Sequence, residues 1–160
     1  MTVAEYNLCV ENFADSIYRF IKKNLRDQHR AEDVVQDTFA KMWEKHETVN
    51  FEKAKSYLYT TAYHTMLDII KKEKRMSVEE EIVTTAHTHN QYTGISEVMN
   101  EAIKRLPASQ RSSLMLRDYE GYSYKEIEEI TGLKESQVKV YIYRARKFLK
   151  SYLGSIDNII

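Results

Sequence analysis

Cysteine, proline and glycine are scarce in this sequence of 160 residues, which contains one cysteine, one proline and four glycines. Because Cys9 is the only cysteine, no disulfide can form within the chain, and we expect Cys9 to be a small core residue. Few prolines and glycines mean few helix breakers, so long helices are expected. No apolar run approaches the roughly 20 residues of a membrane span, and we find no signal peptide. These absences predict a soluble, cytoplasmic protein.

An excess of charge of either sign is also missing, since 24 basic residues balance 24 acidic ones. A neutral chain has no overall field that attracts nucleic acid. The charges are nevertheless segregated: basic residues cluster near residues 71–75 and 139–150, and acidic residues near 32–37 and 79–81. If this protein binds nucleic acid, we therefore expect the isolated chain to bind weakly unless a partner helps to hold it there.

Residues 121–149 carry the most informative pattern of the chain and predict two helices across a tight turn. Ser123 and Glu126 have the spacing of a capping box, so the first helix should begin at Ser123. Gly132 can adopt the positive φ of a helix C-terminus and should end it. The segment therefore resembles a helix-turn-helix.

The second helix of this segment separates its apolar and polar residues. Its apolar positions fall at offsets of four, three and four, which predicts one buried face: Val138, Ile142, Ala145 and Leu149. Its other face offers amide, hydroxyl and cationic groups, which can reach base edges and phosphates: Ser136, Gln137, Lys139, Tyr143, Arg144 and Lys147. We interpret it as a candidate recognition helix, with an ordinary solvated face as the alternative.

Helical periodicity extends over most of the chain, and no strand-like alternation is found. The predicted helices cover residues 5–25, 31–45, 52–74, 96–105 and 109–119, besides the two described above. We expect the second to begin at Ala31, since Glu32 and Asp33 suit the positive end of a helix dipole. Residues 76–95 are polar with little periodicity and predict a flexible linker. The expected fold is all-α, with two compact helical modules joined by this tether.

Several of these segments resemble conserved regions of bacterial sigma factors. The stretch AEDVVQDTFAKMW (31–43) is similar to region 2 of the sigma-70 family. Three further stretches are similar to region 4: LPASQR (106–111), EGYSYKEIEEITG (120–132) and VKVYIYRARKFL (138–149). With no region 1 or 3, the layout resembles the extracytoplasmic-function (ECF) group. The resemblance implies region 2 over residues 1–75, a linker over 76–95, and region 4 over 96–153.

A member of this family would be a dissociable subunit of RNA polymerase that directs transcription initiation. The resemblance implies that region 2 binds the clamp helices of the core enzyme, recognises the −10 promoter element and helps to melt it. Region 4 would bind the flap of the core and place its recognition helix at the −35 element. The implied partners are core RNA polymerase, promoter DNA and an anti-sigma factor. No cofactor, small-molecule substrate or catalytic activity is implied.

The resemblance also assigns roles to particular residues. The clamp-binding helix would use Asp33, Gln36 and Asp37, which form one patch at i, i+3 and i+4. The −10 element would meet Tyr59, Tyr63, His64, Lys71, Lys72 and Arg75, with the tyrosines stacking on unpaired bases. The −35 element would meet Ser136, Gln137, Lys139, Tyr143, Arg144 and Lys147. The loop of residues 46–52 matches the loop that captures a flipped −10 base in the family.

Two departures from the family and several alternatives stay open at this point. Ala62-Tyr63-His64 stands where the family commonly has Ala-Arg-Asn, and Tyr141 where arginine is frequent, which leaves the preferred promoter sequences undetermined. The acidic patch can be a solvated face, and the tyrosines can be core residues. The main alternative function is a conventional helix-turn-helix regulator that binds an operator without polymerase, and another is a protein-interaction adaptor. We predict no metal site at His87 and His89, which lack a third ligand.

Overall fold

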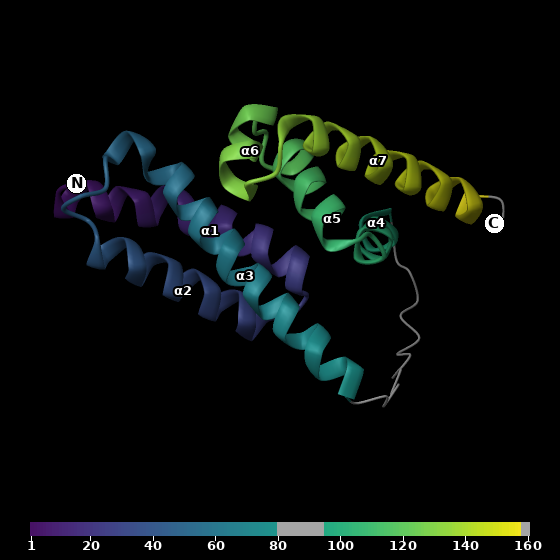
Figure 1. The fold of residues 1–160 in the computed structure, drawn as a ribbon, viewed down its shortest axis with the longest axis horizontal. Coiled ribbons are helices and arrows are strands. Elements are labelled where there is room, and N and C mark those ends of the chain that lie inside the picture. Colours follow the sequence, from purple (N-terminus) through teal and green to yellow (C-terminus); the bar gives the residue numbers. More distant parts are fainter. Residues whose placement is uncertain (80–94, 158–160) are drawn as a thin grey trace.

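The computed structural model describes residues 1–79 and 95–157, and every regular element within these ranges is helical. The all-α prediction is therefore confirmed for the part of the chain that is described. Most of the predicted linker, with His87 and His89, lies outside the described residues. Figure 1 shows a bundle built by the first half of the chain, with the helices of the second half beside it.

The first module contains α1 (Val3–Leu25), α2 (Gln28–Glu44), a short 3-10 turn (Phe51–Lys53) and α3 (Ala54–Glu79). Each helix packs against the other two. The buried stripes supply the core: Cys9, Ile17, Phe20, Ile21, Val34, Met42, Leu58, Ala62 and Met66. Each fully buried large apolar side chain contributes about 1.5–3 kcal/mol, so this core is the main stabilising feature of the bundle.

Two helix boundaries differ from the predictions. Helix α2 begins at Gln28 and not at Ala31, because the Asp27 carboxylate caps the helix by accepting from the backbone N–H groups of His29 and Arg30 at 3.0 and 3.2 Å. The assignment of Glu32 and Asp33 to its first turn is therefore wrong. Helix α3 continues through Glu79, so the prediction that the linker begins at residue 76 is also wrong.

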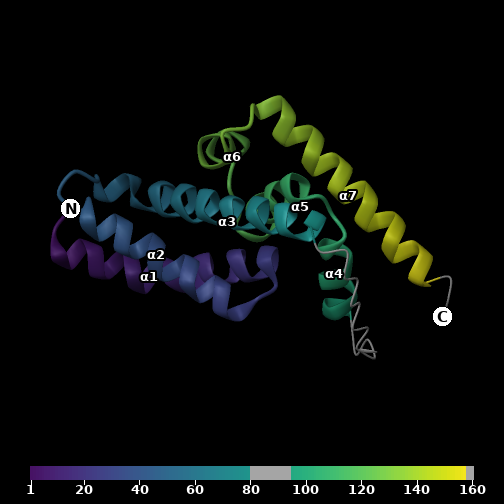
Figure 2. The ribbon, with the colours of Figure 1, turned by 60° about the horizontal axis from the view of Figure 1, so that its bottom comes forward.

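The second module contains α4 (Ile95–Lys104), α5 (Ala108–Leu114), a π-helical turn (Met115–Tyr119), α6 (Tyr124–Thr131) and α7 (Glu135–Asp157). The single helix predicted over 109–119 is thus divided by a change to π geometry. Helix α7 packs against α4, α5 and α6, and Figure 2 shows it running along the outside of the molecule.

The helix-turn-helix forms as the sequence predicts. Ser123 Oγ accepts from the backbone N–H of Glu126 at 3.2 Å, and the Glu126 carboxylate accepts from the N–H of Ser123 at 3.2 Å. Gly132 ends α6 with φ of 76°, the left-handed conformation that glycine adopts without a steric penalty. The capping box and the glycine stop are therefore both confirmed.

The two modules pack against each other, which the sequence did not predict. Helix α6 lies on α3, and α5 touches α1 (Figures 1 and 2). The rings of Tyr59 from α3 and Tyr122 from the second module meet edge to face, with centroids 5.1 Å apart, and the Lys55 ammonium lies 4.5 Å from the Tyr122 ring centre. Buried residues of both modules form one hydrophobic cluster. The sequence predicts the two modules but not their relative orientation, which these contacts fix in a closed arrangement.

A buried carboxylate connects the modules on one side of this interface. The side chain of Glu120 is only 6% exposed, and its oxygens accept two hydrogen bonds from Arg19 of α1, at 3.2 and 3.3 Å. The Tyr59 hydroxyl lies 3.1 Å from the same carboxylate and 2.9 Å from Ser16 Oγ. Charge-assisted hydrogen bonds of this kind fix the orientation of one module on the other.

A buried amide connects the modules on the other side. Asn24 of α1 is 3% exposed, and its carbonyl oxygen accepts from Ser112 Oγ at 3.1 Å and from Arg111 Nε at 3.3 Å. Its amide nitrogen donates to the Phe20 carbonyl at 2.8 Å and lies 3.4 Å from the sulfur of Met115. Since all its polar atoms have partners, Asn24 can be buried without a large desolvation cost.

Candidate nucleic-acid and protein interfaces

The polar face of α7 is exposed over its first four turns. Val138, Ile142 and Ala145 are buried, as the spacing predicts. All six residues assigned to the −35 element are exposed: Ser136, Gln137, Lys139, Tyr143, Arg144 and Lys147. The Tyr143 ring is 66% exposed. The structure therefore brings the predicted recognition residues together on one accessible face.

Contacts within the module distinguish the cations of α7 from one another. Arg146 forms two hydrogen bonds to Asp118, at 2.5 and 3.1 Å, and this carboxylate raises the pKa of Arg146. Lys139 lies 3.6 Å from Glu135, an exposed pair of small energetic value. Within the described residues, Arg144 forms no ion pair. Arg146 therefore has a structural partner, and Arg144 is available to a ligand.

Gln137 has a local role in capping that its position in the sequence does not reveal. Its side-chain oxygen accepts from the backbone N–H of Lys134 at 3.1 Å, just before the start of α7. The lysine side chain has no acceptor oxygen, so Gln137 makes the capping contact with the backbone in its place. The Gln137 oxygen is thus occupied, and its NH₂ group is the part that can reach DNA.

Helix α3 divides the residues assigned to the −10 element into two groups. His64, Lys71, Lys72 and Arg75 are exposed. Tyr59 and Tyr63 are 1% and 2% exposed, and burial raises the pKa of both hydroxyls. In the closed arrangement both rings belong to the core, so their stacking on bases stays a prediction that requires the second module to move away from α3.

The same part of α3 faces the helix-turn-helix. Tyr57 is half-buried, and together with Thr60 and Thr61 it lines a cleft of about 500 Å³ whose other wall includes Glu129 of α6. Tyr141 of α7 is close enough to raise the pKa of Tyr63 further. The predicted −10 surface and the second module therefore cover each other here.

The acidic patch on α2 has the predicted geometry. Asp33, Gln36 and Asp37 are exposed, whereas Val34 and Thr38 on the same helix are buried. Asp37 pairs with Lys41 at 3.0 Å, and both side chains are 48% exposed. An exposed i, i+4 pair contributes about 0.3–0.5 kcal/mol, so a partner can displace it at little cost.

An aromatic stack beside the predicted base-capturing loop was also missed. The ring of His46 stacks on Trp43 at 4.4 Å with an interplanar angle of 11°, and Tyr6 meets Trp43 edge to face at 5.0 Å. Trp43 and Phe51 are 43% and 37% exposed. The aromatic residues in the sequence were a signal for this cluster, but only folding shows that they meet.

Other kinds of site find no support in the part of the chain that is described. Within it, no group of three or more His, Cys, Asp or Glu side chains is arranged to hold a metal ion. The described helices include none whose length and apolar character would suffice to cross a bilayer.

Comparison with known proteins extends these observations to nearly the whole chain. Residues 9–76 match the family model "Sigma-70 region 2", and residues 96–149 match "Sigma-70, region 4". The ECF RNA polymerase sigma factor SigM of Bacillus subtilis is 26% identical over 145 residues, which cover 87% of this chain and 89% of SigM. RNA polymerase sigma factor SigV of the same organism is 29% identical over 151 residues, covering 93% and 91% of the two chains.

A solved structure shares this fold. The sigma factor RpoE of Bartonella quintana, crystallised with the anti-sigma factor NepR, superposes with a TM-score of 0.79 at 24% identity, covering 95% of this chain and 98% of RpoE. CnrH, solved with the cytosolic domain of CnrY, superposes with a TM-score of 0.70 at 19% identity, covering 94% and 88%.

Proposed function

The chain belongs to the sigma-70 family of bacterial RNA polymerase sigma factors, and we propose that the exposed faces of α2, α3 and α7 carry its contacts with polymerase and promoter. As an ECF-type sigma factor, it binds core RNA polymerase and directs promoter recognition and transcription initiation. Sigma factors are non-catalytic initiation factors, so the protein is not an enzyme. Because its partner is the polymerase, its place of action is the cytoplasm.

The observation that carries the promoter assignment is the exposed polar face of α7. It belongs to a helix-turn-helix, and its buried stripe docks on the rest of the module, so the opposite face is free to enter a major groove. Arg144 suits the base edges and Lys139 the phosphates. A regulator that acts without polymerase would have the same helix, but it would not need the region 2 helix with its acidic patch.

Weak contacts by each module are sufficient if the core enzyme holds both. With no net charge, the chain has little long-range attraction for DNA. Once docked on the core through Asp33, Gln36 and Asp37, both modules experience a high effective concentration of promoter, and their affinities combine. The neutral composition therefore favours promoter binding by the holoenzyme over binding by the free subunit.

The closed arrangement has to open for the −10 contact. The part of α3 with Tyr57, Tyr59 and Tyr63 is covered by the second module, so α6 must leave α3 before this surface can meet melted DNA. The similar sigma factor RpoE was crystallised with the anti-sigma factor NepR, and we propose that an anti-sigma factor also binds this chain.

Reconstitution with core polymerase tests the function directly. We expect the protein to comigrate with core enzyme and to give runoff transcripts from specific genomic fragments only when core is present. A conventional regulator would bind an operator fragment specifically without polymerase and would leave transcript start sites unchanged. Specific binding by the free chain, with no comigration, would reject the assignment.

Reversing the charge of the α2 patch should weaken core binding. Asp37→Arg adds a cation where the proposal places a basic partner, and Asp37 is exposed, so the fold should be unaffected. Loss of one charge pair at an interface rim and its replacement by repulsion should weaken core affinity by about tenfold. Fluorescence anisotropy with core polymerase measures this. Glu11→Arg, at an exposed position of α1, is the matched control. Equal core affinities of the Asp37 and Glu11 variants would show that the α2 patch is only solvated.

The exposed histidine of α3 should act in initiation and not in core binding. His64 lies beside buried Tyr63, and its ring can donate to bases or phosphates. His64→Ala should lower transcription by about three- to tenfold, the value of one lost hydrogen bond, with core affinity intact. Single-round transcription and core titration separate the two effects, with His29→Ala, an exposed histidine of α2, as control. Equal transcription by both variants would contradict the assignment of His64 to the −10 element.

A further inference from the structure

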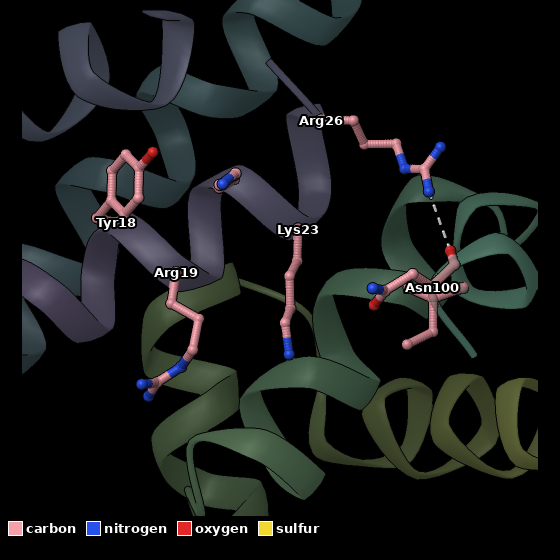
Figure 3. Close-up of a pocket in the computed structure, with 7 residues that line it drawn as sticks. Tyr18, Arg19, Lys23, Arg26 and Asn100 are labelled. Carbon is pink, nitrogen blue, oxygen red and sulfur yellow. Dashed lines mark hydrogen bonds between the residues drawn. The ribbon is translucent and has the colours of Figure 1, made fainter. Parts of the chain in front are cut away.

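A cationic cleft lies between the modules, away from the faces assigned to polymerase and promoter. It has a volume of about 580 Å³ and is lined by α1 and α4: Tyr18, Arg19, Lys22, Lys23, Arg26, Asn100 and Ile103. Figure 3 shows Arg19 and Lys23 extending from α1 toward the helices of the second module. Arg26 reaches across to donate a hydrogen bond to the Asn100 carbonyl at 3.1 Å. The cleft therefore exists only while the modules are closed.

The four cations form one row along α1. Arg19, Lys22 and Lys23 recur at i, i+3 and i+4, so they share one face of α1. Arg26, the left-handed C-cap that ends α1, lines the same cleft, and seven residues of helical rise correspond to about 10 Å between Arg19 and Arg26. The sequence alone gives no signal for this row, because a basic helix face is usually solvated. Here the second module forms the opposite wall, and low-dielectric walls focus the field of the row.

Most of this positive charge has no counter-ion in the part of the chain that is described. Arg19 pairs with Glu120, but no ion pair joins Lys22, Lys23 or Arg26 to a carboxylate of residues 1–79 or 95–157. The Lys23 ammonium lies 3.8 Å from the Tyr119 ring centre, and that of Lys22 lies 5.8 Å from the Tyr18 ring centre. Glu101 acts on the charge of Arg26 but forms its ion pair with Arg105.

Closure makes these charges costly. Burial lowers the pKa of Lys23 and the neighbouring Arg19 guanidinium lowers it further, while the Glu120 carboxylate opposes part of this shift. Burial also lowers the pKa of Arg26. Desolvation and like-charge repulsion both disfavour the cationic forms. A bound anion would relieve both effects, so the closed arrangement and an anion should stabilise each other.

We propose that this α1–α4 cleft binds a small molecule that carries two or more phosphate groups. Arginine and lysine together are the side chains best suited to phosphate oxygens, and a row of 10 Å is longer than one phosphate needs. The volume falls within the range of small-ligand sites. Tyr18 and Ile103 add apolar surface for the rest of such a molecule.

Ligand binding would act on promoter recognition through the equilibrium between closed and open arrangements. A ligand that contacts both modules binds only the closed form and stabilises it by mass action. The closed form covers the part of the −10 surface that contains Tyr59 and Tyr63, so the ligand would lower initiation. The site would thus report the level of a phosphorylated metabolite to transcription.

Titration of the full chain with sodium tripolyphosphate tests the site. We expect calorimetry to show one site, with orthophosphate binding at least about tenfold more weakly because it meets fewer cations. Lys22→Gln should weaken tripolyphosphate binding about tenfold, and Lys22→Arg should retain it. Lys22 is exposed and forms no ion pair with a described residue, so neither change should disturb the fold. Lys71→Gln, which removes the same charge from an exposed position of α3, should change tripolyphosphate affinity less than twofold.

A second variant separates the cleft from general attraction by positive charge. Glu120→Lys adds two positive charge units yet should weaken tripolyphosphate binding, because it separates the walls of the cleft; general attraction predicts tighter binding. Equal losses in Lys22→Gln and Lys71→Gln, or no loss in Lys22→Gln, would overturn the proposal. Tighter binding of a pentaglutamate peptide than of tripolyphosphate would also overturn it, since the cleft would then be a protein-docking site.

Discussion

Glu120→Lys should separate the two modules while leaving each one folded. The change places an ammonium next to Arg19 and removes the acceptor that lies 3.1 Å from the Tyr59 hydroxyl. The lost hydrogen bonds involve a charged group, but Arg19 is half-exposed, so solvent screening reduces their contribution. We expect a cost of about 2 kcal/mol to the closed form, which shifts the equilibrium toward the open form about 30-fold. We expect a larger radius of gyration in small-angle X-ray scattering and unchanged helical content by circular dichroism.

Two further variants make the opening experiment specific. Tyr59→Phe removes only the hydroxyl and should open the molecule less, by about 1 kcal/mol. Glu128→Lys makes the same charge change on the exposed side of α6. Among the described residues, Glu128 forms no ion pair with the first module. Identical scattering profiles for Glu120→Lys and Glu128→Lys would show that the Glu120 carboxylate does not hold the modules together.

Arg144→Ala should produce the largest loss at the −35 element. If the guanidinium pairs with a base, its loss should cost about 1–3 kcal/mol and relax specificity at one position. Arg144 is exposed and lies opposite the buried stripe, so truncation opens no cavity. Promoter binding by holoenzyme, measured against a panel of −35 variants, gives both the affinity and the specificity. An unchanged ranking of the panel would show that Arg144 does not read a base.

Lys139 and Arg146 provide contrasting results on the same helix. Lys139→Ala should weaken binding evenly across the panel and reduce the salt slope by about one, as expected for a phosphate contact. Arg146→Ala should instead lower thermal stability, because it removes the two hydrogen bonds to Asp118, and should leave specificity unchanged. If none of the three variants changed promoter affinity, α7 would not be the recognition helix.

Local chemistry explains why the sequence predicted α6, the turn and α7 well. Ser123 and Glu126 satisfy each other's backbone donors within four residues, and Gly132 supplies a conformation that other residues rarely adopt. Such signals act over one helical turn and do not depend on the rest of the chain. The start of α2 was missed because the cap, Asp27, lies before the apolar periodicity begins. The π turn after Leu114 likewise has no local sequence rule.

The sequence by itself determined the helices, their buried stripes, the polar face of α7 and the sigma-70 family. Only the tertiary structure decided which of those polar residues are free. It buried Tyr59 and Tyr63, paired Arg146 with Asp118, and joined Glu120 to Arg19, a residue 101 positions away in the chain. Periodicity shows which side of a helix is apolar, but not which distant surface will cover it. Contacts between the modules depend on shape and charge across two folded surfaces, and these exist only after both have formed.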